Sequence, residues 1–228
     1  TPRQNTLATQ GVSTLPSFTG REPDDAVGPV AGRYIIKSVW EEASVGLDDD
    51  SVQEFASFAQ LRAALNARRS RLGGSAFAEP YVEGREFNLS LLGGADGIQV
   101  LPPAEIRFVD YPADKPRIVG YRAKWDEQSP EYHNTPRTFD FDDADRALLG
   151  NLTQMAERCW HVLGLRGYAR VDFRVDRRCC PFVIEVNANP CLSPDAGFIA
   201  AARRAELSMV EVVRRLIQQA MTSGRSLT

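Results

Sequence analysis

Two acidic residues in the last third of the chain have the spacing of a divalent metal site. Asp172 lies in the run RVDFRVD and Glu185 lies in the run IEVNANP, with a charged turn between the two runs. If the runs are the strands of a hairpin centred between Arg178 and Cys179, the two acids face each other across the strand pair. Opposed like charges about 5 Å apart destabilise a sheet unless a counter-charge lies between them.

The apolar side chains of the same runs predict the register of the hairpin. Pairing about that centre joins six apolar residues across the strands: Val171 with Val186, Phe173 with Ile184 and Val175 with Phe182. All six then share one face, which indicates a side packed against a core. The opposite face pairs Asp172 with Glu185 and Arg170 with Asn187.

A hard divalent cation would supply the missing counter-charge. Asp172, Glu185 and Asn187 offer only oxygen ligands, and these favour Mg²⁺ or Mn²⁺. Mg²⁺ is usually held by one or two carboxylates while substrate phosphates complete its octahedron, and Arg170 on the same face could meet such a phosphate. The alternative is a solvated face on which the acids form salt bridges with Arg170 or Arg174. A bulge in either strand would change the register.

The composition narrows the classes of function. The 228 residues are enough for one large domain or two small lobes, and 27 basic against 30 acidic residues give a net charge of −3. No basic field therefore points to nucleic acid or to an anionic membrane. No apolar run approaches the roughly 20 residues of a membrane span, and the first residues do not read as a signal peptide.

The cysteines and histidines do not form a zinc motif. The chain has four cysteines, none of them in a CxxC pair, and only two histidines. Cys179 and Cys180 are adjacent in the expected turn and are interpreted as reduced thiols. A cytoplasmic location fits this pattern best.

Strand-like runs dominate the middle of the chain. A β-branched run predicts a strand at residues 33–39, and runs punctuated by Gly and Pro predict further strands at residues 76–82, 86–93, 97–102, 104–110 and 117–124. Residues 19–32 and 126–140 read as loops. Because the strands fall mostly in hairpins and not in regular βαβ units, the pattern predicts an α+β fold.

Helix signals occur at both ends of the chain and between the strands. A capping box of Ser51 with Glu54 predicts a helix whose apolar face is Phe55, Phe58, Leu61 and Leu65. Further helices are expected at about 143–163, from Ser193-Pro194, and from a second capping box at Ser208 to about residue 221. The first residues read as the end of a helix stopped at Gly11, which suggests that a domain precedes this chain.

The ordered motifs resemble the carboxyl-terminal half of ATP-grasp ligases, and most closely the D-alanine–D-alanine ligase group. RVDFRVD followed by IEVNANP resembles that family's Arg-x-Asp strand and Glu-x-Asn-x-x-Pro-Gly motif. YIIKSVWEEASVG resembles the lysine strand and Ser-Val-Gly loop, and FAEPYVEGREFNLSLLG resembles the hinge. RAKW resembles the lysine–aromatic element of the substrate loop. The likeness covers nearly the whole chain.

The resemblance implies an ATP-grasp fold of two α+β lobes with mostly antiparallel sheets that enclose the nucleotide. Residues 1–75 would form the smaller lobe with the phosphate loop, and residues 76–228 the larger lobe with the metal site. It also implies an ATP-dependent ligase. A substrate carboxylate attacks the γ-phosphate to give an acyl phosphate, and an amine then attacks that intermediate. The expected substrates are amino acids or peptides, with ATP and Mg²⁺ or Mn²⁺ as cofactors. Neither nucleic acid nor a membrane is expected as a partner, and a homodimer stays open.

Individual roles also follow from the resemblance. Lys37 would meet the nucleotide phosphates, and the backbone of Ser44, Val45 and Gly46 would close over them. The adenine hinge would be formed by Glu79, Pro80, Tyr81 and Val82, with Glu86 on the ribose hydroxyls. The metal ligands would be Asp172, Glu185 and Asn187. The catalytic residues would be Arg170, which stabilises the charged intermediate, Lys124 near the γ-phosphate or the substrate, and Ser44.

Each of these roles has a plainer alternative. Lys37 could be a strand-edge lysine and Glu86 a surface acid. The Ser-Val-Gly run at 44–46 could be a simple turn, and a lysine before an aromatic residue, as at Lys124, is common.

Three places depart from the family pattern. Residues 41–43 bring two acids and an alanine to a loop that is usually richer in glycine. Cys191 stands where the family has glycine, and Ala196 stands where the D-alanine enzymes carry a serine for the second substrate's carboxylate. The resemblance therefore predicts the reaction class without singling out D-alanine. The alternatives are a truncated or non-catalytic ATP-binding module, and an ATP-grasp ligase of another substrate class.

Overall fold

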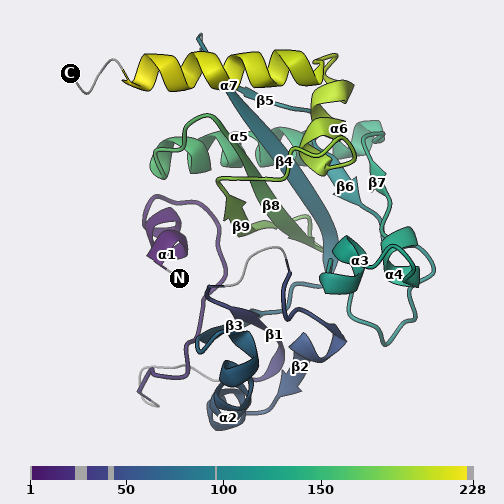
Figure 1. Ribbon diagram of the computed structural model, residues 1–228. Helices are drawn as coiled ribbons and strands as arrows, with labels where there is room; N and C mark the ends of the chain where they lie inside the picture. The colour runs from purple at the N-terminus through teal and green to yellow at the C-terminus, as the bar shows by residue number, and fades with distance from the viewer. Residues whose placement is uncertain (1, 24–29, 41–43, 96, 225–228) are drawn as a thin grey trace. The chain divides into compact units, whose positions relative to one another are not determined.

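The computed structural model describes residues 2–23, 30–40, 44–95 and 97–224 (Figure 1). The chain divides into two compact units. The first comprises Leu15–Glu83 and Arg107–Pro136, and the second comprises Pro2–Thr14, Gly84–Ile106 and Arg137–Thr228. The assignment of functional lobes at 1–75 and 76–228 stays a prediction.

The first unit contains a three-stranded antiparallel sheet in the order β2-β1-β3. Strand β1 is Gly32–Ser38, β2 is Val52–Phe55 and β3 is Ala76–Pro80. Helix α2, Phe58–Arg68, packs its buried Phe58, Leu61 and Leu65 against the apolar side chains of this sheet. The 3₁₀ turns Asp49–Ser51 and Arg69–Leu72 flank β2 and α2.

The predicted helix start at Ser51 is wrong. Residues Val52–Phe55 form β2, and α2 begins only after Ser57, whose hydroxyl accepts a hydrogen bond from the Gln60 amide. Ser51 instead completes a capping box with Asp48 around the short 3₁₀ turn. Phe55 still reaches the predicted core, although it does so from a strand.

The segment Arg107–Pro136 contains two short helices. Helix α3, Tyr121–Trp125, and helix α4, Pro130–His133, replace the strand predicted at 117–124 and part of the loop predicted at 126–140. Ile118 and Val119 made a strand plausible, but neither residue pairs with a strand in the described part of the chain. The ends of the segment are tied together, since the Arg107 amide donates to the Pro136 carbonyl and the Val109 amide donates to the Asn134 carbonyl.

The second unit is built on a six-stranded sheet in which every pairing is antiparallel. The order is β7-β6-β4-β8-β9, with β5 on the remaining stretch of β4. The strands are β4 Gly84–Gly94, β5 Gly97–Val100, β6 Ala104–Ile106, β7 Arg137–Thr138, β8 Tyr168–Asp176 and β9 Pro181–Asn187. The predicted α+β class with mostly antiparallel sheets is confirmed.

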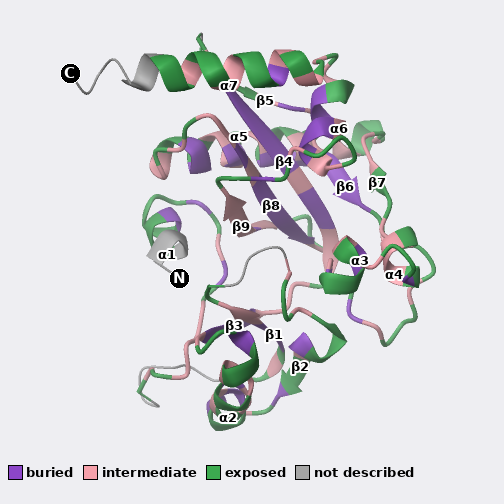
Figure 2. Cartoon of the chain, in the orientation of Figure 1, coloured by how far each residue is buried: buried purple, intermediate pink, exposed green. Residues whose placement is uncertain are grey.

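Helices cover this sheet unevenly. Helix α5, Arg146–Val162, packs Leu152, Ala156 and Cys159 against one apolar face of β4 and β8, where the buried residues of Figure 2 gather. Helices α6, Gly197–Arg204, and α7, Met209–Gly224, share a second core with Leu92 near the end of β4. Helix α1, Pro2–Thr9, adds Leu7 to the first of these cores.

The predicted hairpin register is right at the acids and wrong beyond them. Asp172 pairs with Glu185 and Arg170 with Asn187, as predicted. A bulge after Asp172 then shifts the pairing, so that Phe173 faces Val183 instead of Ile184. The buried residue of β9 is accordingly Val183, which also donates its amide to the Ser13 carbonyl.

The helix boundaries differ in one further place. Ser193 begins a turn closed by the Ala196 amide, and α6 starts only at Gly197. The start of α7 agrees with the prediction, because the Ser208 hydroxyl accepts from the Glu211 amide. Among the described residues, no helix is long and apolar enough to cross a membrane.

Candidate active site

One face of the sheet in the second unit is both polar and buried. Alternation along the strands places Glu86, Asn88 and Ser90 of β4 on the side opposite to the core residues Phe87, Leu89 and Leu91. The paired strands continue this polar face with Arg170, Asp172 and Arg174 of β8 and with Glu185 and Asn187 of β9. Glu86, Ser90, Asp172 and Arg174 are all buried. Buried polar groups need partners, and here Glu86 pairs with Arg174 while Asp172 pairs with Arg170 and Asn88.

Asp172 lies at the centre of this polar face. Its Oδ1 accepts from Arg170 Nε at 2.7 Å and from Asn88 Nδ2 at 2.9 Å, and its Oδ2 accepts from Arg170 Nη2 at 2.8 Å. The charge of Asp172 raises the pKa of Arg170, and Glu185 and Glu86 add to this effect against the opposing effect of burial. Arg170 therefore supplies part of the counter-charge that the opposed acids require.

A second ion pair lies beside the first. Arg174 Nη1 is 3.2 Å from Glu86 Oε2, and both side chains are about nine-tenths buried. The three carboxylates of Glu86, Asp172 and Glu185 thus share the face with the two guanidinium groups of Arg170 and Arg174. The excess of negative charge favours an additional cation.

The predicted metal ligands fit a hard cation by their chemistry and by their register. Asp172 and Glu185 are opposite each other, and Asn187 follows two residues later on the same face of β9. The Asn187 Oδ1 accepts from the Asn189 amide, which orients its side chain in the turn after β9. Among the described residues, no three His, Cys, Asp or Glu side chains converge as a metal site. The Asn187 amide or phosphate oxygens would have to complete the ligand set.

Lys37 and Glu79 meet within the first unit. They lie on the neighbouring strands β1 and β3, and Lys37 Nζ is 2.8 Å from Glu79 Oε2. Glu79 is fully buried, whereas the Lys37 side chain is 20% exposed. A buried carboxylate needs such a partner, and the exposed part of the ammonium can still meet an anion.

The predicted hinge leaves β3 at Pro80 and continues to Val82. The Tyr81 amide donates to the Arg33 carbonyl, and the Arg33 guanidinium lies 4.7 Å from the centre of the Tyr81 ring. The Tyr81 hydroxyl accepts from the Arg117 amide at 2.9 Å. The hinge is therefore held from two sides by residues of its own unit.

The predicted phosphate loop begins outside the described residues, because residues 41–43 are not described. Ser44 has φ +65° and Gly46 has φ +72°, so the loop turns sharply at both positions. The Ser44 hydroxyl donates to the Val119 carbonyl at 2.7 Å, while the exposed Val45 lies between them. The Ser44 side chain thus attaches the loop to the segment that contains Val119.

Lys124 differs from the other lysines of this unit. It lies on α3, is half-buried, and forms no ion pair within the described part of the chain. Trp125 beside it is exposed. The ammonium of Lys124 is therefore not committed to a carboxylate of the described residues.

The two positions that depart from the family pattern lie just after the polar face. Hydrogen bonds from Ser193 lower the pKa of the exposed Cys191 thiol, with a smaller contribution from Arg170. Ala196 is the N-cap residue of α6 and offers no side-chain hydrogen bond there.

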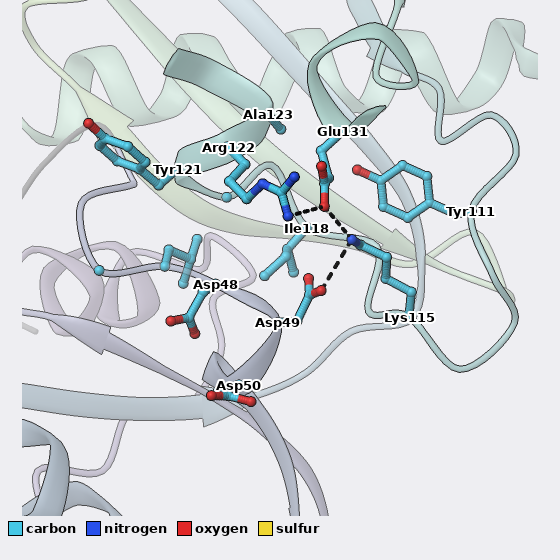
Figure 3. A pocket seen from close by; sticks show the side chains of 13 residues that line it. Asp48, Asp49, Asp50, Tyr111, Lys115, Ile118, Tyr121, Arg122, Ala123 and Glu131 are labelled. Atoms are coloured by element: carbon cyan, nitrogen blue, oxygen red, sulfur yellow. Dashed lines mark hydrogen bonds and ion pairs between the residues drawn. The ribbon is translucent and has the colours of Figure 1, made fainter. Parts of the chain in front are cut away.

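The sequence motifs assigned no site role to several of these residues. Asn88 and Arg174 contact Asp172 and Glu86, and the alternation in EFNLSLLG already placed Asn88 on the face of Glu86. A pocket in the first unit was also missed. It involves Lys115, Asp49 and Glu131, which lie far apart in the sequence (Figure 3).

Known proteins resemble this chain over most of its length. The family model described as D-ala D-ala ligase C-terminus matches residues 30–218. The D-alanine–D-alanine ligase of Synechococcus sp. (strain JA-2-3B'a(2-13)) is 31% identical over 201 residues, which are 88% of this chain and 55% of that protein. The uncharacterized protein y4sG of Sinorhizobium fredii is 28% identical over 197 residues, 86% of this chain and 53% of that protein.

Solved structures show the same fold. The D-alanine–D-alanine ligase from Bacillus anthracis superposes with a TM-score of 0.70 at 20% identity, covering 99% of this chain and 68% of that chain. Its complex with ATP gives a TM-score of 0.66 at 18% identity, with coverage of 99% and 66%.

The family match and the fold together define a protein of the ATP-grasp class. Within that class, the chain belongs to the D-Ala-D-Ala ligase C-terminal family. It spans about half the length of the curated relatives it matches.

Proposed function

We propose that this chain is the ATP-binding and catalytic part of a carboxylate–amine ligase that works through an acyl phosphate. The observation that carries the proposal is the pairing of Asp172 with Glu185 on a buried polar face that also holds Arg170. Buried charges carry a large desolvation penalty and so contribute little to the stability of the fold, which favours a binding role for this face. Its excess negative charge suits a bound Mg²⁺ ion.

Asp172, Glu185 and Asn187 would hold Mg²⁺ or Mn²⁺. The bound ion would neutralise phosphate charge as the γ-phosphoryl group is transferred. Asp172 already accepts hydrogen bonds from Arg170 and Asn88, which fix the orientation of its carboxylate. Arg170 remains a permanent cation on the same face, where it can stabilise negative charge on the reacting groups.

The first unit would bind the rest of the nucleotide. The ammonium of Lys37, held in place by Glu79, would contact phosphate oxygens, and the backbone amides of residues 44–46 would close over them. The main chain of residues 79–82 would contact the adenine, and Glu86 would contact the ribose. These roles rest on the family relationship and on the placement of each residue.

The chemistry needs positioned charges and no protein nucleophile. The substrate carboxylate attacks the γ-phosphate and releases ADP, and an amine then attacks the acyl phosphate and releases phosphate. Lys124, which is not paired within the described residues, would approach the γ-phosphate or the substrate carboxylate. Arg170 would stabilise the oxyanion that forms when the amine attacks.

The substrates are proposed to be amino acids or peptides. Cys191 and Ala196 depart from the D-alanine enzymes where substrate contacts are expected, so D-alanine is not singled out. A second candidate is an ATP-binding module without turnover, which the departures at Cys191 and Ala196, where substrate contacts are expected, would favour.

A substitution pair tests the metal site. Asp172→Asn and Glu185→Gln keep the side-chain size and remove one negative charge each. We expect each variant to lose Mg²⁺-dependent release of ADP by about a hundredfold or more, while circular dichroism shows an unchanged fold. Asp143→Asn removes an exposed carboxylate of the same unit and serves as the control. Turnover that survives in both variants would contradict the assignment.

A substrate screen separates the two candidates. Phosphate release is measured with Mg²⁺–ATP and a panel of amino acids and dipeptides, and ATP binding is measured in parallel by calorimetry. Release stimulated by an amino acid or peptide supports the ligase. Binding without release for any member of the panel supports the module instead.

A further inference from the structure

A pocket of about 490 Å³ lies within the first unit, directly after the phosphate loop. One wall is formed by Gly46–Asp50 and the other by residues between Tyr111 and Glu131 (Figure 3). Lys115 joins the two walls, since its Nζ is 2.5 Å from Glu131 Oε1 and 3.1 Å from Asp49 Oδ2. The Lys115 side chain is 20% exposed and that of Glu131 is 12% exposed, so water screens their contact only partly.

Both members of the Lys115–Glu131 pair are ionised at neutral pH. Burial opposes each charge, but the hydrogen bond between them raises the pKa of Lys115 and lowers the pKa of Glu131. Arg122 Nη1 lies 3.3 Å from the same Glu131 oxygen. Glu131 therefore forms ion pairs with both Lys115 and Arg122. Of these two cations, Lys115 also forms an ion pair with Asp49.

Asp49 lies three residues after Gly46, in the 3₁₀ turn that follows the phosphate loop. The loop also contacts the segment Arg107–Pro136 directly. The Ser44 hydroxyl donates to the Val119 carbonyl, and the Tyr121 amide donates to the Leu47 carbonyl at 2.9 Å. The Lys115–Asp49 ion pair thus joins the segment Arg107–Pro136 to the turn after the loop, in addition to the hydrogen bonds at Ser44 and Leu47.

The packing at Gly120 shows how closely these parts fit. A Cβ at this position would lie 2.7 Å from the Leu47 carbonyl oxygen, so only glycine allows the segment to approach the loop. The other ion pair near this turn, Arg68 with Asp48, has an N–O distance of 3.7 Å and does not involve the segment. Lys115 is therefore a cation that joins the segment to the turn after the loop.

We propose that Lys115 is a positioning residue, which holds the phosphate loop in its nucleotide-binding conformation by pairing with Asp49 and Glu131. The consequence for ATP affinity rests on the proposed function, whereas the effect on the loop itself does not. Lys115 contacts neither the substrate nor the phosphates in this role. It acts through Asp49 on the turn that ends the loop.

The first measurement needs no nucleotide. Hydrogen–deuterium exchange is followed at the amides of Leu47 and Tyr121, which close the hydrogen bonds of the loop. We expect Lys115→Met to speed exchange at both amides about tenfold, while amides of the β1–β3 ladder keep their rates. Lys115→Arg retains a cation and should restore slow exchange. Arg146→Met, which removes an exposed ion pair of the second unit, should change neither amide.

The second measurement is the dissociation constant for Mg²⁺–ATP by calorimetry. We expect an increase of about tenfold for Lys115→Met and recovery for Lys115→Arg. Asp49→Asn, at an exposed position, should reproduce the effect. Combining it with Lys115→Met should add little, because both changes break the same contact.

Two results would contradict a positioning role for Lys115. The first is unchanged exchange at Leu47 and Tyr121 in both Lys115→Met and Asp49→Asn. The second is faster exchange throughout the β1–β3 ladder, because Lys115 would then stabilise the whole unit and not the loop in particular. If the unsubstituted protein does not bind ATP, the proposed function fails, while the exchange result still decides the role of Lys115.

Discussion

Asp172 accepts hydrogen bonds from Arg170 and Asn88, and this arrangement explains how two acids can share one strand pair. Arg170 lies two residues before Asp172 on the same face of β8 and donates hydrogen bonds to both carboxylate oxygens of Asp172. Glu185 faces Asp172 from β9, and its charge also raises the pKa of Arg170. The Arg170 guanidinium therefore offsets the charge of both Asp172 and Glu185. A cation bound between the two acids would leave some of the Arg170 N–H groups available to a phosphate.

The four cysteines should differ sharply in reactivity. Cys159 is buried in the core of the second unit, and burial raises its pKa to about 12, whereas Cys179, Cys180 and Cys191 are exposed. We expect three thiols to react with a small disulfide reagent at pH 7 in the native protein, and Cys159 to react only after unfolding. Peptide mass mapping after brief labelling identifies them. Labelling of Cys159 at the rate of the others would contradict the packing of α5.

A serine substitution refines the same measurement. Hydrogen bonds from Ser193 lower the pKa of Cys191 and so increase its thiolate fraction at neutral pH. Ser193→Ala should therefore slow the labelling of Cys191 at pH 7 and leave Cys179 and Cys180 unchanged. At a pH well above the thiol range the difference should disappear, because every exposed thiol is then ionised.

At the scale of elements, the hairpin of β8 and β9 shows what alternation can and cannot predict. The acids were placed correctly because polar and apolar residues alternate strictly around Asp172 and Val186. The bulge was not predictable from this alternation. It leaves Ile184 out of the ladder, and it accompanies the hydrogen bond from Val183 to Ser13, which is remote in sequence.

The remaining errors have a similar origin. Ser51 and Glu54 have the spacing of a capping box, but Val52–Phe55 pair with β1, and this pairing outweighs the local signal. Ile118 and Val119 suggested a strand at 117–124, yet the Tyr121 amide donates to the Leu47 carbonyl and α3 begins at Tyr121. Local patterns placed Asp172 opposite Glu185 and Arg170 opposite Asn187, whereas contacts between distant segments determined where the backbone turns.

A pair of glycine substitutions tests the approach of β4 to β8. A Cβ at Gly84 would lie 1.9 Å from the Val175 carbonyl oxygen, so the two strands must separate locally in Gly84→Ala. We expect a loss of roughly 3 kcal/mol in the free energy of unfolding, from urea denaturation. In Gly150→Ala, within α5, nothing lies within 4 Å of the new Cβ, and the helix should gain about 0.5–1 kcal/mol. Equal effects of the two substitutions would show that the strand contact is not tight.

At the scale of the whole molecule, the residues proposed for ATP are divided between the two units. Lys37, residues 44–46, the hinge and Lys124 belong to the first, whereas Glu86, Arg170 and the metal ligands belong to the second. The residues proposed for phosphate binding and those proposed for metal binding therefore belong to different parts of the chain. If Mg²⁺ and ATP bind as one ligand, we expect substitutions in either part to weaken the binding of both.

Thermal denaturation tests this division of roles. Mg²⁺ with a non-hydrolysable ATP analogue at about a hundredfold excess over the dissociation constant should stabilise the protein by about 3 kcal/mol, and Mg²⁺ alone should have little effect. Lys37→Met in the first unit and Asp172→Asn in the second should each reduce this stabilisation. The exposed Asp143→Asn should retain it. Full stabilisation in either site variant would contradict the shared assignment.

The segment Arg107–Pro136 leaves the sheet after β6 and returns to it at β7, and these two strands are direct neighbours. Its base is closed by the hydrogen bonds from Arg107 to Pro136 and from Val109 to Asn134. Because its ends are already joined, its length can change at a small entropic cost, about 0.6 kcal/mol for each doubling. Residues can therefore be added to or removed from the parts of this segment away from Lys115, Gly120 and Lys124, and we expect β6 and β7 to keep their pairing when they are.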